Sequence, residues 1–145
     1  MAATEARARV IAEALLWERT PYRHQGRVKG AGCDCAMFPA EVYAAAGVIP
    51  PLDEIPYYPE QWNLHRDAER YLDMVLRYAR EIPEPTGPAD FVLWRYGRTL
   101  SHGAIILDWP RIIHSTKPVG VTQDNARLNA TLADPRRERR FFTLW

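Results

Sequence analysis

The sequence predicts an α+β domain in which helices come first and a meander of short strands follows. Apolar residues recur at helical spacing as far as about Arg80, and short apolar runs separated by Gly, Asp or Pro come after it. The 145 residues are 47% hydrophobic and 26% charged, which is enough apolar material to bury one core. We therefore expect a single domain over residues 1–145, with N-terminal helices packed on an antiparallel β-sheet.

The first helix is expected from about Ala3 to Arg19. Its apolar positions follow the 3.6-residue period of an α-helix, at Val10, Ile11, Ala14, Leu15 and Trp17. The segment from Thr20 to Gly26 includes Pro21, which breaks the helix and leads by a loop to the next element.

A second helix is expected to begin at Asp34. A carboxylate suits the N-cap position because it accepts hydrogen bonds from the unpaired N–H groups of the first turn. Pro39 falls within the first turn or so, where its missing N–H is tolerated. The apolar positions that follow are Phe38, Val42, Tyr43 and Ala46, and Gly47 provides the C-terminal stop.

Prolines at positions 50, 51, 56 and 59 predict an irregular connection after the second helix. A helical pattern then predicts a long helix from about Trp62 to about Arg80, with further apolar positions at Ala68, Tyr71, Leu72, Val75, Leu76 and Ala79. Prolines at positions 83, 85 and 88 close it, and strand-like runs follow at residues 91–94, 104–107, 112–113 and 141–145.

Cys35 is expected in the first turn of the second helix, where a thiol becomes a nucleophile. Unpaired backbone N–H groups and the positive end of the helix dipole favour a thiolate over a thiol there. The only other cysteine, Cys33, is separated from Cys35 by a single residue, which is too close for a relaxed disulfide, and it is expected to pack in the core.

Two histidines stand in neighbouring strand-like runs. His102 is at the entrance of the run at 104–107 and His114 directly follows the run at 112–113, with a turn at Asp108-Trp109-Pro110. A hairpin would bring the two imidazoles together, one as a base for the Cys35 thiol and the other as the group that orients it.

With these motifs the chain resembles the NlpC/P60 cysteine peptidases, which are papain-like cell-wall hydrolases. Gly32-Cys33-Asp34-Cys35 is similar to the family's Gly-x-Asp-Cys nucleophile motif, and residues 87–92 are similar to its Pro-Gly-Asp-Leu-Val strand. Ser101-His102-Gly103-Ala104-Ile105 resembles the His-Val-Gly-Ile strand, and Ile113-His114-Ser115 the strand with the third polar residue. Thr20-Pro21-Tyr22-Arg23 resembles the segment whose tyrosine lines the substrate site, so the motifs occur in the family's order over residues 20–115.

The resemblance implies hydrolysis of an amide bond in peptidoglycan stem peptides, commonly between D-glutamate and a diamino acid, with no cofactor. In that scheme Cys35 attacks the carbonyl, His102 protonates the leaving amine and His114 orients His102. The Cys35 N–H and the Tyr22 hydroxyl would stabilise the oxyanion, and Asp34 is expected on the same oxyanion and substrate-binding side of the site.

The chain departs from the family pattern in two places. Ala36-Met37 replace the usual Ser-Gly after the nucleophile, and His24-Gln25-Gly26 replace a Gly-Gly pair at the border of the substrate groove. The inserted segment from about Pro50 to Arg80 resembles a prophage-encoded subgroup associated with phage tails, which implies tail proteins as partners. The charged N-terminus lacks the apolar stretch of a signal peptide, so we expect synthesis in the cytoplasm and delivery in a phage tail or virion.

Three other interpretations are open. Cys33, Cys35, His102 and His114 are the residue types of a Cys2His2 zinc site, although Cys-x-Cys is tighter than the usual ligand spacing. A catalytically inactive tail-structural or binding module would keep the fold without the chemistry, and a same-fold amidase or acyltransferase would act on another bond. The net charge of +1 provides no field for nucleic acid or a membrane, so neither is expected as a partner.

Overall fold

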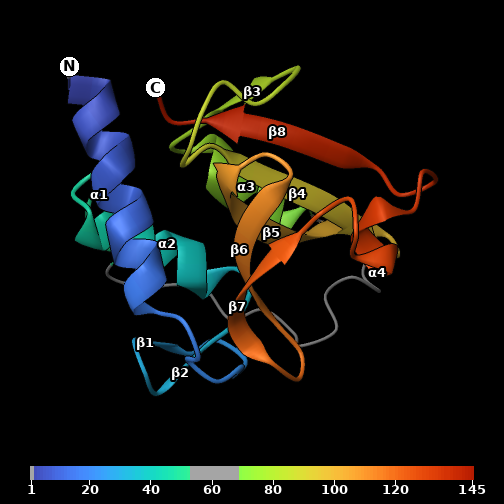
Figure 1. Ribbon diagram of the computed structural model, residues 1–145, viewed down its shortest axis with the longest axis horizontal. Helices are drawn as coiled ribbons and strands as arrows, with labels where there is room; N and C mark the ends of the chain where they lie inside the picture. Colours follow the sequence, from blue (N-terminus) through green and yellow to red (C-terminus); the bar gives the residue numbers. More distant parts are fainter. Residues whose placement is uncertain (1, 53–68) are drawn as a thin grey trace.

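The computed structural model describes residues 2–52 and 69–145, which fold as helices packed on a six-stranded antiparallel sheet (Figure 1). Helix α1 (Ala2–Leu16) packs beside α2 (Met37–Ala45), and α2 and α3 (Arg70–Leu76) contact the central strands. None of the helices in these described residues is long and apolar enough to cross a membrane.

The large sheet has the strand order β3-β8-β4-β5-β6-β7. Strands β4 to β7 form a meander, whereas the last strand, β8, enters between β3 and β4 (Figure 1). The bounds are β3 Arg80–Ile82, β4 Phe91–Tyr96, β5 Thr99–Asp108, β6 Arg111–Thr116, β7 Gly120–Asn125 and β8 Arg139–Thr143. The smaller elements are the pair β1 (Arg27–Val28) and β2 (Gly32–Cys33), and helix α4 (Ala130–Ala133).

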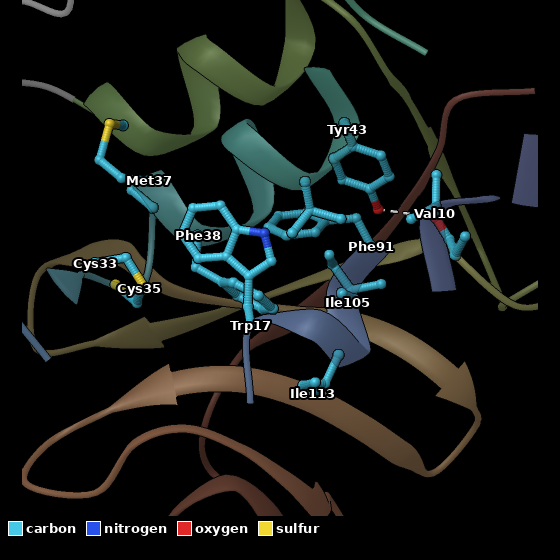
Figure 2. Close-up of a cluster of buried hydrophobic side chains, with 14 of the residues drawn as sticks. Val10, Trp17, Cys33, Cys35, Met37, Phe38, Tyr43, Phe91, Ile105 and Ile113 are labelled. Carbon is cyan, nitrogen blue, oxygen red and sulfur yellow. Dashed lines mark hydrogen bonds between the residues drawn. The ribbon is translucent and has the colours of Figure 1, made fainter. Parts of the chain in front are cut away.

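Alternate residues of the central strands belong to two different buried clusters. The cluster under α1 and α2 includes Phe91, Leu93, Ile105 and Ile113, and the second cluster includes Val92, Trp94, Ala104 and Ile112. Figure 2 shows the first of these, in which the ring of Trp17 meets Phe38 edge-on at 5.8 Å. Cys33 and Cys35 lie at one end of it (Figure 2), and the candidate nucleophile contacts the first residues of β5, a central strand of the sheet.

The first two helices are confirmed, with changed ends. Helix α1 stops at Leu16 instead of Arg19, whose φ of 71° is left-handed and cannot continue a right-handed helix. Helix α2 begins at Met37 and not at Asp34, because Cys35 and Ala36 form a turn. At its C-terminus, Gly47 takes a φ of 77°, as the predicted stop requires.

The prediction of a long third helix from about Trp62 to about Arg80 is wrong at its C-terminal end. Residues 53–68, where the prediction placed its start and much of the proline-rich connection, lie outside the described residues. Helix α3 ends at Leu76, and Arg80 opens β3 instead of closing the helix. The backbone at Arg80–Ile82 pairs with β8, and this long-range partner outweighs the local helical pattern.

The four predicted strands are confirmed as parts of β4, β5, β6 and β8, and the turn at 108–110 joins β5 to β6. Strands β1, β2, β3 and β7 and helix α4 were not predicted. Strand β7 is polar over most of its length, so it has no apolar run that would mark it as a strand.

Candidate active site

Asp34 organises the turn that carries Cys35. Its Oδ1 accepts hydrogen bonds from the backbone N–H groups of Ala36 (3.1 Å) and Met37 (2.8 Å), and its Oδ2 accepts one from Gln25 (2.7 Å). The predicted capping interaction is therefore made, although α2 starts three residues later. The carboxylate is buried and is not among the residues that line the cleft, and its Oδ1 contacts the backbone of the turn that carries Cys35.

The Cys35 thiol lies against the backbone on both sides of His102. Its Sγ donates to the carbonyl oxygen of Ser101 at 3.3 Å, and a backbone hydrogen bond from Gly103 reaches the same thiol. Cys35 is only 7% exposed, and burial, reinforced by the charge of Asp34, raises its pKa well above the ordinary value. The resting form is thus a thiol, and a nearby base is needed to make it a nucleophile.

Tyr71 of α3 holds the peptide that carries the nucleophile. Its hydroxyl donates a 2.6 Å hydrogen bond to the carbonyl oxygen of Cys35, and its ring packs over Gly103 of β5. A Cβ at position 103 would collide with the Tyr71 hydroxyl and would lie 2.5 Å from Cζ of Phe91. Only glycine leaves room for this contact, so the His-Gly sequence of β5 also serves to seat Tyr71.

Gly103→Ala is expected to lower the free energy of unfolding by about 2–4 kcal/mol, through overpacking and loss of the Tyr71 hydrogen bond. Urea denaturation measures the change. In a Tyr71→Phe background the same substitution should cost less, because the hydroxyl that it strikes is gone. A cost below about 0.5 kcal/mol in the native background would contradict the close packing of Tyr71 and Phe91 on Gly103.

The expected pairing of the two histidines is confirmed. His102 on β5 and His114 on β6 approach with Nε2 of the first 2.8 Å from Nδ1 of the second. A register shift after Trp94, which pairs with His102, leaves Ser101 outside the ladder, with its carbonyl turned to the thiol. The ring of Tyr96 stacks on His102 at 5.1 Å, and burial lowers the pKa of both histidines, so both imidazoles are neutral near pH 7.

Two polar residues of this site escaped the sequence analysis. Asp124 of β7 places Oδ2 3.1 Å from Nε2 of His114, and Asn129 donates from its side-chain amide to the same carboxylate oxygen at 2.8 Å. Asp124 could have been identified only by predicting a strand after β6 that pairs with it. The sequence does not predict β7, so Asp124 was missed.

Cys35, His102 and His114 line one cleft with a volume of about 550 Å³. Tyr22 lies in its wall, with Nζ of Lys117 5.3 Å from the centre of its ring. Lys117 also lowers the pKa of Cys35, which opposes the effect of burial. The other lining residues are Tyr96, Ser101, Ser115, Thr116, Lys117, Val119, Thr122, Asp124, Asn129 and Thr131.

Cys33 packs in the core, as expected. It is fully buried, its Sγ lies 3.8 Å from Oγ of Ser115, and burial raises its pKa to about 12. Among the described residues, no group of three or more His, Cys, Asp or Glu side chains is arranged to hold a metal ion. His102 and His114 instead direct ring nitrogens at each other.

A scan against family models and a search of curated proteins found no match. Solved structures do match. The NlpC/P60 domain of the peptidoglycan hydrolase SagA has a TM-score of 0.61 at 20% identity and covers 94% of this chain and 97% of its own. A P60 domain of an antigen from Mycobacterium avium subspecies paratuberculosis has a TM-score of 0.63 at 18% identity, and the match covers 99% of this chain and 98% of that domain's chain.

RipD from Mycobacterium tuberculosis is described as a non-catalytic NlpC/P60 domain protein adapted to peptidoglycan binding. It has a TM-score of 0.61 at 14% identity, and the match covers 97% of this chain and 98% of the RipD chain. These likenesses span nearly the whole of each chain. The chain therefore has the papain-like NlpC/P60 fold, with its helices packed on an antiparallel sheet.

Proposed function

We propose that the chain is a cysteine-type hydrolase that cleaves an amide bond in peptidoglycan stem peptides. The observation that carries this proposal is the placement of the Cys35 thiol against the backbone on both sides of His102, with both residues lining one cleft. The Nε2 of His102 is engaged with His114, so Nδ1 is the ring nitrogen that remains for the thiol proton.

The reaction proceeds through an acyl-enzyme. His102 takes the proton from Cys35 Sγ as the sulfur bonds to the carbonyl carbon, and the Cys35 N–H and the Tyr22 hydroxyl stabilise the oxyanion. His102 then gives that proton to the leaving amine as the C–N bond breaks. Water, deprotonated by His102, releases the acyl group and restores the thiol.

The substrate and the setting are proposed in finer detail from the resemblance of the motifs. The scissile bond is taken as γ-D-glutamyl to diamino acid, and the partners as phage tail proteins. SagA, described as a peptidoglycan hydrolase, supports a cell-wall substrate. The phage-tail setting rests on the inserted segment from about Pro50 to Arg80, and detection of this chain in purified phage particles by mass spectrometry would test it.

Turnover of a defined peptide is the test of the proposed function. Incubation with a γ-D-glutamyl-diamino acid peptide is expected to release the free diamino acid, detected by mass spectrometry. Rapid acid quenching should trap the γ-glutamyl acyl group on the proteolytic fragment that contains Cys35. Absence of both the product and the adduct, with this peptide and with intact peptidoglycan, would overturn the proposal.

A second candidate is a peptidoglycan-binding module without catalysis. The observation in its favour is the burial of Cys35, which holds the resting thiol protonated. RipD, which shares the fold, is described as non-catalytic. Retention of the chain on insoluble peptidoglycan, without release of any peptide fragment, would favour this candidate over the hydrolase.

A further inference from the structure

The cleft contains a line of polar contacts that continues beyond the two histidines. Asp124 on β7 lies diagonally opposite His114 on β6, because Asp124 pairs in register with Ile112. Oδ2 of Asp124 is 3.1 Å from Nε2 of His114, whose side chain is 1% exposed. Since His114 contacts His102 through its other nitrogen, the three side chains form one chain of contacts that ends at the base.

Asp124 is held as a carboxylate. Burial raises the pKa of this carboxyl group, but hydrogen bonds from the Asn129 side chain and the Asn125 N–H have the opposite and larger effect. Its pKa is therefore below the ordinary value. A carboxylate is only an acceptor of hydrogen bonds. Nε2 of His114 must therefore carry the hydrogen in the contact with Asp124.

The hydrogen on Nε2 of His114 determines which nitrogen of His102 carries a hydrogen. A neutral His114 that carries hydrogen on Nε2 has a bare Nδ1, which can only accept, so Nε2 of His102 must donate to it. A neutral His102 with hydrogen on Nε2 has a bare Nδ1. That nitrogen is the one required to take the proton of the Cys35 thiol.

We propose that Asp124 is a positioning residue that acts through His114 to fix both imidazoles as Nε2–H tautomers, so that His102 presents a bare Nδ1 to the Cys35 thiol. This inference rests on the proposed roles of Cys35 as nucleophile and His102 as base. In the step itself the S–H bond breaks, an N–H bond forms at Nδ1, and the resulting imidazolium keeps its Nε2–H donated to His114. The carboxylate charge of Asp124 then offsets the new positive charge across one intervening ring.

The charge of Asp124 acts among several other groups around the two rings. Several elements of the described part of the chain bring titratable or charged side chains to Cys35 and the histidines. They are Tyr22 before β1, Asp34 before α2, Tyr71 of α3, Tyr96 of β4, Lys117 after β6, Asp124 of β7 and Arg137 before β8. Burial, His114 and Arg137 all disfavour an imidazolium at His102. Asp124 raises the pKa of His114, so its charge favours a positive charge on the ring that contacts His102.

Asp124→Asn removes the charge and keeps the shape. If the amide oxygen faces His114 and Asn129, both side chains still donate to it; if the amide N–H₂ faces them, it donates to Nε2 of His114 and moves the hydrogen of that ring to Nδ1. In both orientations the negative charge that offsets an imidazolium at His102 is lost. Proton transfer from Cys35 becomes less favourable, so thiolate forms at a higher pH than in the wild type.

Alkylation of Cys35 by iodoacetamide measures this without any peptide substrate. In a Cys33→Ser background, followed by intact mass, Asp124→Asn is expected to slow alkylation at pH 7 roughly tenfold and to move its pH profile upward by about one unit. Asp124→Glu should restore part of the rate. Asp73→Asn, on the exposed face of α3, is the matched control and should alkylate like the wild type.

Imidazole ¹⁵N spectra of the wild type give a second measurement that needs no variant to fold. The chain has four histidines, and His102 and His114 are both expected as Nε2–H tautomers at pH 8. A Nδ1–H tautomer at His114, or an Asp124→Asn variant with unchanged alkylation rate and pH profile, would overturn the proposal. If the spectra and the alkylation behave as expected but the wild type cleaves no peptide, the proposed function fails and the positioning role of Asp124 stands.

Discussion

Cys35→Ala is expected to abolish hydrolysis of the γ-D-glutamyl-diamino acid peptide, with a loss of at least about 10⁴-fold relative to the wild type. The substitution removes the atom that forms the acyl bond, and none of the other residues that line the cleft is a cysteine. Because Cβ is retained, the free energy of unfolding should change by only about 1 kcal/mol. Initial rates and urea denaturation on the same preparations separate the two effects.

Cys33→Ser is the matched control for that experiment. The new hydroxyl would lie beside Oγ of Ser115, which can share a hydrogen bond with it, so turnover should stay within a few-fold of the wild type. The pair of variants thus separates the two neighbouring thiols. Comparable loss in both, or residual turnover in Cys35→Ala, would be incompatible with Cys35 as the nucleophile.

Asp90→Ala is expected to lower the free energy of unfolding by about 3–5 kcal/mol. The Asp90 carboxylate is completely buried ahead of β4, where Oδ2 accepts from the Thr86 N–H, the Thr86 hydroxyl and the Gly87 N–H. Oδ1 accepts from the Thr143 hydroxyl at 2.6 Å and from Arg7 at 3.3 Å. Alanine would remove the acceptor of all these donors, although Arg7 keeps its hydrogen bond to the Pro88 carbonyl oxygen. Thermal and urea denaturation would detect the loss.

Asp108→Ala provides the comparison for Asp90. Asp108 is an exposed carboxylate at the end of β5, so its removal should change the free energy of unfolding by less than about 0.5 kcal/mol. Asp90→Asn should fall between the two alanine variants, because the amide keeps one acceptor but presents N–H₂ to groups that donate. Equal stability of the two alanine variants would show that Asp90 does not bind the donors around it.

The parts of the fold that are encoded locally could be predicted from the sequence. Helix α1, helix α2 and strands β4, β5 and β6 have clear apolar periods of their own. Strand β3 (Arg80–Ile82) and strand β7 (Gly120–Asn125) do not, and they become strands because β8 and β6 offer backbone partners. A pattern within one segment carries no information about such a partner, and the helix was therefore extended wrongly to Arg80.

The same distinction separates the parts of the candidate site. The approach of His102 to His114 follows from a hairpin between adjacent runs and could be predicted. The contact of Asp124 with His114 depends on a strand that the sequence did not predict. Tyr71 fitted the helical period as a core residue, yet its hydroxyl also holds the Cys35 carbonyl, because the phenol carries a donor that a purely apolar pattern ignores.

The position of β8 determines when this site can be completed during synthesis. Strand β4 gains its second neighbour only when Arg139–Thr143 has been made, and the buried Asp90 gains its Thr143 hydroxyl at the same moment. The residues that supply the thiol and both imidazoles leave the ribosome earlier. At that stage β5, which carries His102, pairs with a β4 that still lacks β8 on its other side. Such non-local pairings fold late. A growing chain would thus hold its reactive residues in an unassembled state until synthesis has passed Thr143.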